Sequence, residues 1–143
     1  MGRGRGIATY YKKQFTTDIE VNEKNLQLRK LKSATADIIV LYKSQEETLN
    51  NLEKILKNIV DSDMPTVIIG DFNSNFLDKE AREARTFLRA NSFVKLVNAP
   101  THKDGNCLDQ AFVRDVQKVN KYRIQVEGKY YSDHKALSLI IQR

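Results

Sequence analysis

The sequence contains one cysteine, two histidines, two prolines and no tryptophan in 143 residues. A single cysteine, Cys107, cannot form an internal disulfide, and it excludes iron–sulfur clusters and zinc sites that need several thiolates. No apolar run approaches the ~18 residues that a membrane-spanning helix needs, so we expect no membrane contact. The apolar stretch at residues 7–10 is too short for the core of a secretory signal. An intracellular location is therefore expected.

Neither a Walker-type loop nor a GxGxxG turn leading into a helix is present, which argues against a nucleotide-binding domain of those types. What the chain does have is positive charge: 24 Lys and Arg against 18 Asp and Glu, a net charge of +6, with a pI near 9.4. Such a surface favours polyanions, although charge alone fits an ordinary solvated surface equally well. The length and the 41% hydrophobic content indicate one globular domain over 1–143.

The hydrophobic pattern predicts a mixed α/β fold. Alternation over 18–31 predicts two half-buried strands around a turn at 22–25. The apolar run 36–42 predicts a central strand that is buried on both faces. Ser44 and Glu47 have the spacing of a capping box, which predicts a helix that begins at Ser44. The remaining expected elements, in order, are a strand at 66–69, a helix at 79–90 and strands at 93–97, 108–113, 122–126 and 136–141.

Polar residues gather where these strands end. The strand at 66–69 leads into Gly70, Asp71, Phe72 and Asn73. In sheets flanked by helices, sites form beyond the carboxyl ends of strands, where Asp71 could bind a metal or accept a proton and Asn73 could hold water or a phosphate oxygen. Gly, Asp and Asn also favour plain turns, so this tetrad alone does not identify a site.

Three further segments carry polar side chains at strand boundaries. Asp133 and His134 precede the last strand, where a carboxylate beside an imidazole suits metal and phosphate chemistry. Asp109 begins another strand behind the polar loop that contains Thr101, and a buried Asp there could orient a histidine. Taken alone, the Asp133–His134 pair is more typical of a loop that faces solvent, and the alternative for Asp109 is an exposed carboxylate on a strand that follows a plain loop.

The fourth segment joins the strand at 36–42 to the helix after it. Tyr42 and Lys43 lie at this junction, where a phenol and a helix N-terminus both favour a phosphate. A tyrosine that packs on the rim of the core is the simpler alternative.

Taken together, these motifs resemble the endonuclease/exonuclease/phosphatase (DNase-I-like) family, most closely the endonuclease domains of retrotransposon- and helitron-type mobile elements. The matching stretches are LYKSQ at 41–45, IIGDFNS at 68–74, PTHKDGNCLD at 100–109, CLDQAFV at 107–113 and YSDHKAL at 131–137. The resemblance implies part of a DNase-I-like α/β sandwich, with mixed sheets flanked by helices. It also implies a DNA endonuclease that depends on Mg²⁺ or Mn²⁺ and works beside a reverse transcriptase or another element-encoded domain in the nucleus.

The resemblance also assigns roles to individual residues. Asp71 would position or deprotonate the attacking water, Asn73 would hold water or phosphate, and Tyr42 would contact the phosphate or the leaving oxygen. His134 would donate to the phosphate, with Asp109 orienting its ring. The resemblance further places Asp133 in the metal shell, and Thr101 and Lys43 among the phosphate or DNA contacts.

One part of the family pattern is not found. The segment Gly2–Tyr10 resembles the family's glycine-rich strand, so the earlier strands, with their Asn and their metal-binding Glu, are expected to be missing. The chain would then correspond to the C-terminal two-thirds of the family domain. Two alternatives follow: a catalytically degraded remnant that binds nucleic acid, and a phosphatase that acts on a small phosphoester.

Overall fold

The computed structural model describes residues 15–44, 46, 49–60, 63–73, 82–98, 100–102, 105, 107–128 and 136–142. The described chain forms ten elements. They are β1 (Thr16–Asn22), β2 (Leu26–Lys32), β3 (Asp37–Lys43), α1 (Leu49–Ile59), β4 (Thr66–Asp71), α2 (Arg82–Ala90), β5 (Val94–Lys95), β6 (Asp109–Arg114), β7 (Lys121–Glu127) and β8 (Ala136–Gln142). None of the helices in the described part is long and apolar enough to cross a membrane.

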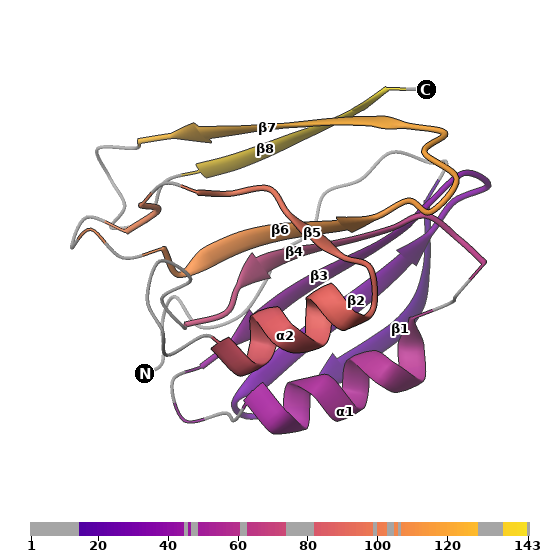
Figure 1. The fold of residues 1–143 in the computed structure, drawn as a ribbon. Coiled ribbons are helices and arrows are strands. Elements are labelled where there is room, and N and C mark those ends of the chain that lie inside the picture. The colour runs from indigo at the N-terminus through magenta and orange to yellow at the C-terminus, as the bar shows by residue number, and fades with distance from the viewer. Residues whose placement is uncertain are drawn as a thin grey trace.

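The strands form a mixed sheet of six and a second sheet of two. The large sheet has the order β1-β2-β3-β4-β6-β5, and β7 pairs with β8. Strands β3 and β4 run parallel, joined through α1, while the other neighbours are antiparallel. Figure 1 shows α1 and α2 on one side of the large sheet and β7 and β8 on the other. This layering confirms the expected α/β sandwich.

The face of the large sheet that lies under the helices is the more deeply buried one. Its side chains Leu28, Ile39, Leu41, Ile68 and Phe112 are at most 2% exposed. Together with Leu52 and Leu56 of α1 and Leu88 of α2 they form the main apolar cluster. Burial of an apolar side chain of this size contributes about 1.5–3 kcal/mol, so this layer holds the helices to the sheet.

Strand β3 differs from its prediction in one respect. It is central, as expected, but its burial alternates, with Ile39 and Leu41 fully buried and Ile38 and Val40 only partly buried. The expectation that both faces are buried is therefore wrong. The second face of β3 packs less completely than the face beneath the helices.

The predicted helix start at Ser44 is also wrong. The Ser44 N–H donates to the Asn25 carbonyl at 2.8 Å, which extends the β2–β3 ladder by one residue, and α1 begins at Leu49. Ser44 is 3% exposed, and its hydroxyl has no hydrogen-bond partner in the described part of the chain. Glu47, the other half of the expected capping box, lies outside the described residues, as do the segments that resemble the family's glycine-rich strand and its Ser-Asp-His motif.

The turn between β6 and β7 is organised by one carboxylate. Asp115 accepts hydrogen bonds from the Asn120 N–H at 3.0 Å, the Val119 N–H at 3.3 Å and the Tyr122 hydroxyl at 2.9 Å. Partial burial acts to raise the pKa of Asp115, but these hydrogen bonds outweigh it, so the pKa lies below its ordinary value. Burial, together with the bond to Asp115, raises the pKa of Tyr122 to about 12.

This arrangement predicts a pH-dependent contribution to stability. A carboxyl whose pKa is lowered on folding stabilises the fold above its unfolded pKa of about 3.9, and the contribution is lost as the pH falls through the folded pKa. We expect Asp115→Asn to lower the free energy of unfolding by about 1 kcal/mol or less near neutral pH, because the turn is open to solvent. When urea unfolding is measured at a series of pH values, the difference in free energy of unfolding between variant and wild type should disappear in acid. A gap that stays constant down to about pH 2 would contradict this assignment.

Candidate active site

Three of the predicted site residues lie side by side on one face of the large sheet. Tyr42 of β3 is the register partner of Asp71 of β4, and Asp71 is the register partner of Asp109 of β6. Residues directly opposite each other on neighbouring strands point to the same face, and adjacent strands lie about 4.8 Å apart. The three side chains thus form a row about 10 Å long, hereafter the Tyr42–Asp71–Asp109 row. All three are partly exposed.

The row lies at one edge of the sheet because of the strand directions. Parallel β3 and β4 both end at this edge, and antiparallel β6 begins there. The face is the one opposite the helices. Leu41 is one position from Tyr42 and Ile68 is three positions from Asp71, so both point away from the row, and both belong to the apolar cluster beneath α1 and α2. Sequence positions 42, 71 and 109 are therefore brought together by sheet register alone.

Gly70 permits the close approach of β3 and β4 just before the row. A Cβ atom built on Gly70 would lie 1.9 Å from the Leu41 carbonyl oxygen, and the residue has a φ of 156°. No larger residue fits this contact without moving the β3 backbone. The glycine of the Gly-Asp-Phe-Asn tetrad is thus required by packing between strands, immediately before the carboxylate of Asp71.

Asn73 fixes the turn that follows Asp71. Its backbone N–H donates to Asp71 Oδ1 at 2.9 Å, and its side-chain Nδ2 donates to the Lys43 carbonyl at 2.5 Å. Its φ of 47° lies in the left-handed region, which asparagine tolerates better than most residues. Asn73 therefore joins the end of β4 to the end of β3 and orients the Asp71 carboxylate, a positioning role in addition to the predicted contact with water or phosphate.

Two predicted phosphate contacts have buried side chains. Thr101 is fully buried, and its hydroxyl oxygen accepts the backbone N–H groups of Leu108 at 3.1 Å and Asp109 at 3.0 Å. Lys43 is 2% exposed, and its ammonium donates to the Ser44 carbonyl at 3.1 Å. In this structure Thr101 holds the start of β6 in place and Lys43 stabilises the end of β3, and their contacts with phosphate or DNA stay predictions.

Gln110 supports the site and was not anticipated from the sequence. It is fully buried, donates from Nε2 to the Val97 carbonyl at 2.9 Å, and accepts the Val97 N–H at 2.8 Å through Oε1. This pair of bonds ties the segment after β5 to the start of β6, next to Asp109. The only sequence signal was a polar residue beside Asp109 in the predicted strand, which does not by itself indicate a structural role.

Cys107 lies in the same region but has the character of a core residue. It is fully buried, and burial raises the pKa of its thiol above the ordinary value, with Asp109 adding to the effect and Lys95 opposing it. A thiol with a raised pKa carries little thiolate at neutral pH and is a poor nucleophile. Cys107 is therefore not a candidate for nucleophilic catalysis.

The remaining predicted residues, Asp133 and His134, lie outside the described residues. Within the described part of the chain, no group of three or more His, Cys, Asp or Glu side chains is arranged to hold a metal ion. Asp71 and Asp109 are nevertheless register partners on one face, where two carboxylates repel each other and a bound cation would offset that repulsion. Oxygen ligands of this kind suit Mg²⁺ or Mn²⁺.

Comparisons with known proteins identify the fold. No protein-family model matches this sequence, and no curated protein sequence matches it. Among solved structures, the endonuclease domain of TRAS1, a telomere-specific non-LTR retrotransposon, is similar at a TM-score of 0.65 and 15% identity, with 90% of this chain covering 67% of that one.

Two other solved structures have the same fold. Cytolethal distending toxin from Actinobacillus actinomycetemcomitans has a TM-score of 0.54 at 17% identity, with 82% of this chain covering 53% of that chain. An endonuclease/exonuclease/phosphatase family protein from Leptotrichia buccalis has a TM-score of 0.53 at 14% identity, with 82% covering 54%. The chain thus spans about two-thirds of the TRAS1 domain and about half of the other two proteins. The resemblance noted from the motifs is confirmed at the level of the fold.

Proposed function

We propose that this chain is a phosphodiesterase domain that cleaves the DNA backbone by attack of water on a phosphate, with help from Mg²⁺ or Mn²⁺. The observation that carries the proposal is the Tyr42–Asp71–Asp109 row, at the sheet edge where three strand ends meet. The fold, shared with a retrotransposon endonuclease domain, and the net charge of +6 support the choice of DNA as substrate.

Each residue of the row has a task that its chemistry suits. Asp71, oriented by the Asn73 N–H, accepts a proton from the attacking water as the new O–P bond forms. Tyr42, on the neighbouring strand, donates its hydroxyl to a phosphate oxygen as negative charge develops there. In the same proposal Asp109 orients His134, which donates to the phosphate while the bond to the leaving oxygen breaks.

The divalent cation belongs to the same proposal. Asp133 would hold it together with the oxygens of the row, and the bound ion would act as a Lewis acid toward the phosphate. The proposal also includes a mobile-element origin, which the similarity to a retrotransposon endonuclease domain supports. A nuclear location and a reverse transcriptase or another element-encoded domain as partner are further parts of the same proposal.

A nicking assay on supercoiled plasmid DNA tests this function. The purified chain should convert supercoiled to open-circular DNA in the presence of Mg²⁺ or Mn²⁺ and should stop when the ion is chelated. Binding of DNA without nicking under either ion would favour a degraded, binding-only domain. Hydrolysis of a small phosphomonoester in place of DNA would favour the phosphatase alternative. Either outcome would overturn the proposal.

A further inference from the structure

A basic groove lies on the face of the large sheet opposite the Tyr42–Asp71–Asp109 row. It has a volume of about 700 Å³ and is formed by α2, the segment that leads into β5, β5 itself and one residue of β6. Its cationic residues are Arg82, Arg85, Arg89 and Lys95, and none of the described residues that line it is acidic. Hereafter this is the α2 groove.

The sheet register separates the α2 groove from the candidate active site. Lys95 of β5 is the register partner of Phe112 of β6, and Phe112 lines the groove. Phe112 and Asp109 are three positions apart on the same strand, so they point to opposite faces and are offset by about 10 Å along it. A ligand in the groove therefore lies on the other side of β6 from the active-site row.

The spacing of the cations indicates a polyanion. Arg82, Arg85 and Arg89 follow one another at three- and four-residue intervals, which places them along one side of α2 over about 10 Å. A single phosphate group is too small to contact all of them, whereas a chain of phosphates can contact each in turn. Ser92, an exposed hydroxyl on the groove wall, adds a donor of the kind that contacts phosphates.

The floor of the groove argues against a protein ligand. Leu88, Phe93 and Phe112 lie there but are only 2%, 6% and 2% exposed, and Val94 is the one well-exposed apolar side chain on the described lining. Protein interfaces need a cluster of apolar side chains that can be buried at their centre, and among the described lining residues Val94 alone is an exposed side chain of that kind. Binding to a nucleic-acid backbone needs mainly positive charge, which the groove has.

We propose that the α2 groove binds the phosphate backbone of a nucleic-acid strand, as a second contact surface separate from the site of cleavage. This inference goes beyond the proposed cleavage reaction and does not depend on it. A strand held on this face would increase the local concentration of nucleic acid without occupying the catalytic row.

The experiment measures binding of a fluorescent oligothymidylate by anisotropy at several salt concentrations, with a chelator present so that no cleavage occurs. The test variant is Arg82→Gln with Arg89→Gln, both at exposed positions, measured beside each single substitution. The matched control is Lys118→Gln with Lys121→Gln, two exposed lysines at the β6–β7 turn, which removes the same charge elsewhere. Thermal unfolding followed by circular dichroism verifies that each variant is folded.

Loss of two phosphate contacts should reduce the slope of log affinity against log salt by about 1.4 and weaken binding about tenfold or more at low salt, while the control binds like wild type. Each single substitution should reduce the slope by about half as much as the double substitution does. Equal binding by the test variant and the control would overturn the proposal. So would an absence of oligothymidylate binding, or binding of polyglutamate in its place, which would identify an acidic protein ligand. Since cleavage is not measured, a failed nicking assay leaves this result unaffected.

Discussion

Substitution of Asp71 by asparagine is expected to slow plasmid nicking by at least about 100-fold, the lower end of what a general base contributes. Asparagine has nearly the same shape and retains an oxygen that can accept the Asn73 N–H, so the turn after β4 should persist. What it lacks is the ability to take a proton from water and the negative charge that attracts a cation. The loss should therefore appear in the rate and not in the stability of the fold.

The control for this experiment is Asp63→Asn. Asp63 is an exposed carboxylate that precedes the other end of β4, so its substitution removes the same charge away from the row. The control should nick DNA at the wild-type rate, and both variants should unfold at the wild-type urea concentration. An Asp71→Asn variant that nicks within about twofold of wild type would remove Asp71 from the mechanism.

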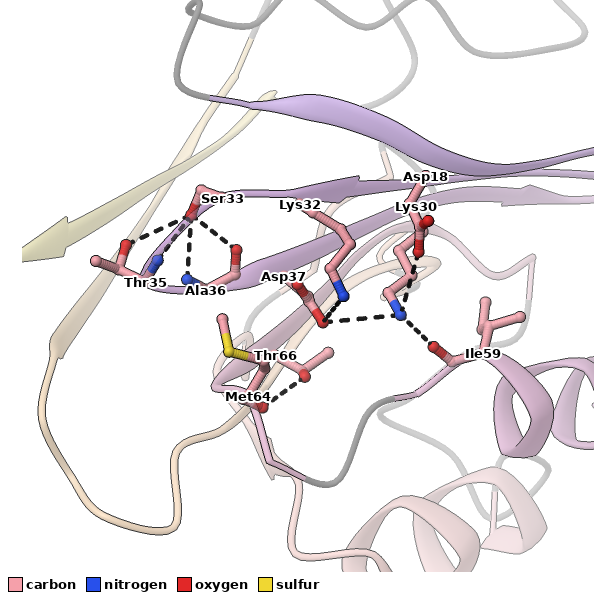
Figure 2. Close-up of polar contacts among 10 residues, drawn as sticks. All are labelled: Asp18, Lys30, Lys32, Ser33, Thr35, Ala36, Asp37, Ile59, Met64 and Thr66. Carbon is pink, nitrogen blue, oxygen red and sulfur yellow. Dashed lines mark hydrogen bonds and ion pairs between the residues drawn. The ribbon is translucent and has the colours of Figure 1, made fainter.

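Replacement of Lys30 by alanine is expected to lower the free energy of unfolding by about 3–5 kcal/mol, the usual effect of removing one partner from a buried charge cluster. Lys30 is 4% exposed, and its ammonium donates to the Ile59 carbonyl at 2.6 Å, at the end of α1. The same nitrogen lies 3.7 Å from Asp37 and 3.7 Å from Asp18, and Lys32 lies 3.9 Å from Asp37. Figure 2 shows the Lys30 ammonium between the two carboxylates and the Ile59 carbonyl at the end of the helix.

The size of the effect follows from what the substitution leaves behind. Asp37 is fully buried, and the substitution removes its 3.7 Å ion pair with the buried Lys30, whereas the 3.9 Å contact is with the partly exposed Lys32. The carboxyl end of α1 would also lose a cation that its dipole favours. The matched control is Arg29→Ala, at the residue next to Lys30 in the sequence. It breaks the 2.7 Å surface ion pair between Arg29 and Glu20 and should lower the free energy of unfolding by less than about 1 kcal/mol.

Urea unfolding of the two variants measures the difference directly. A second variant, Lys30→Met with Asp37→Asn, removes both charges with little change in side-chain volume, and it should recover part of the lost stability. If Lys30→Ala and Arg29→Ala had equally small effects, the cluster would not be a buried, interdependent unit.

The sequence predicted the elements of the fold better than their contacts. Hydrophobic patterning located both helices and the strands, since an apolar stripe or alternation must face a core wherever that core lies. The capping box predicted the wrong helix start at Ser44. The Ser44 N–H forms a hydrogen bond with the distant Asn25 carbonyl, and this bond replaces local helix capping. Such competition is decided by tertiary structure, which no local pattern contains.

The candidate site likewise has residues that the sequence could identify and contacts that it could not. Asp71, Asp109 and Tyr42 could be selected because each stands at a predicted strand boundary, but their alignment in one row depends on the pairing of β3, β4 and β6. Thr101 and Lys43 were selected through the family resemblance, which did not indicate that their buried side chains hydrogen-bond to the backbone beside the site. Lys30 was missed because it occupies an inward position where an apolar residue is expected, and its partners come from β1, β3 and the end of α1.

Paramagnetic broadening by Mn²⁺ in the amide NMR spectrum tests most directly whether the Tyr42–Asp71–Asp109 row is a cation-dependent catalytic centre. Titration with Mn²⁺ should broaden the amides of Tyr42, Asp71 and Asp109 first, while Asp37, Thr66 and Arg114, at the opposite ends of the same three strands, stay sharp. The Asp71→Asn variant should need much more Mn²⁺ for the same broadening. Broadening centred on another part of the molecule, or unchanged in that variant, would contradict the assignment of the row as the active site.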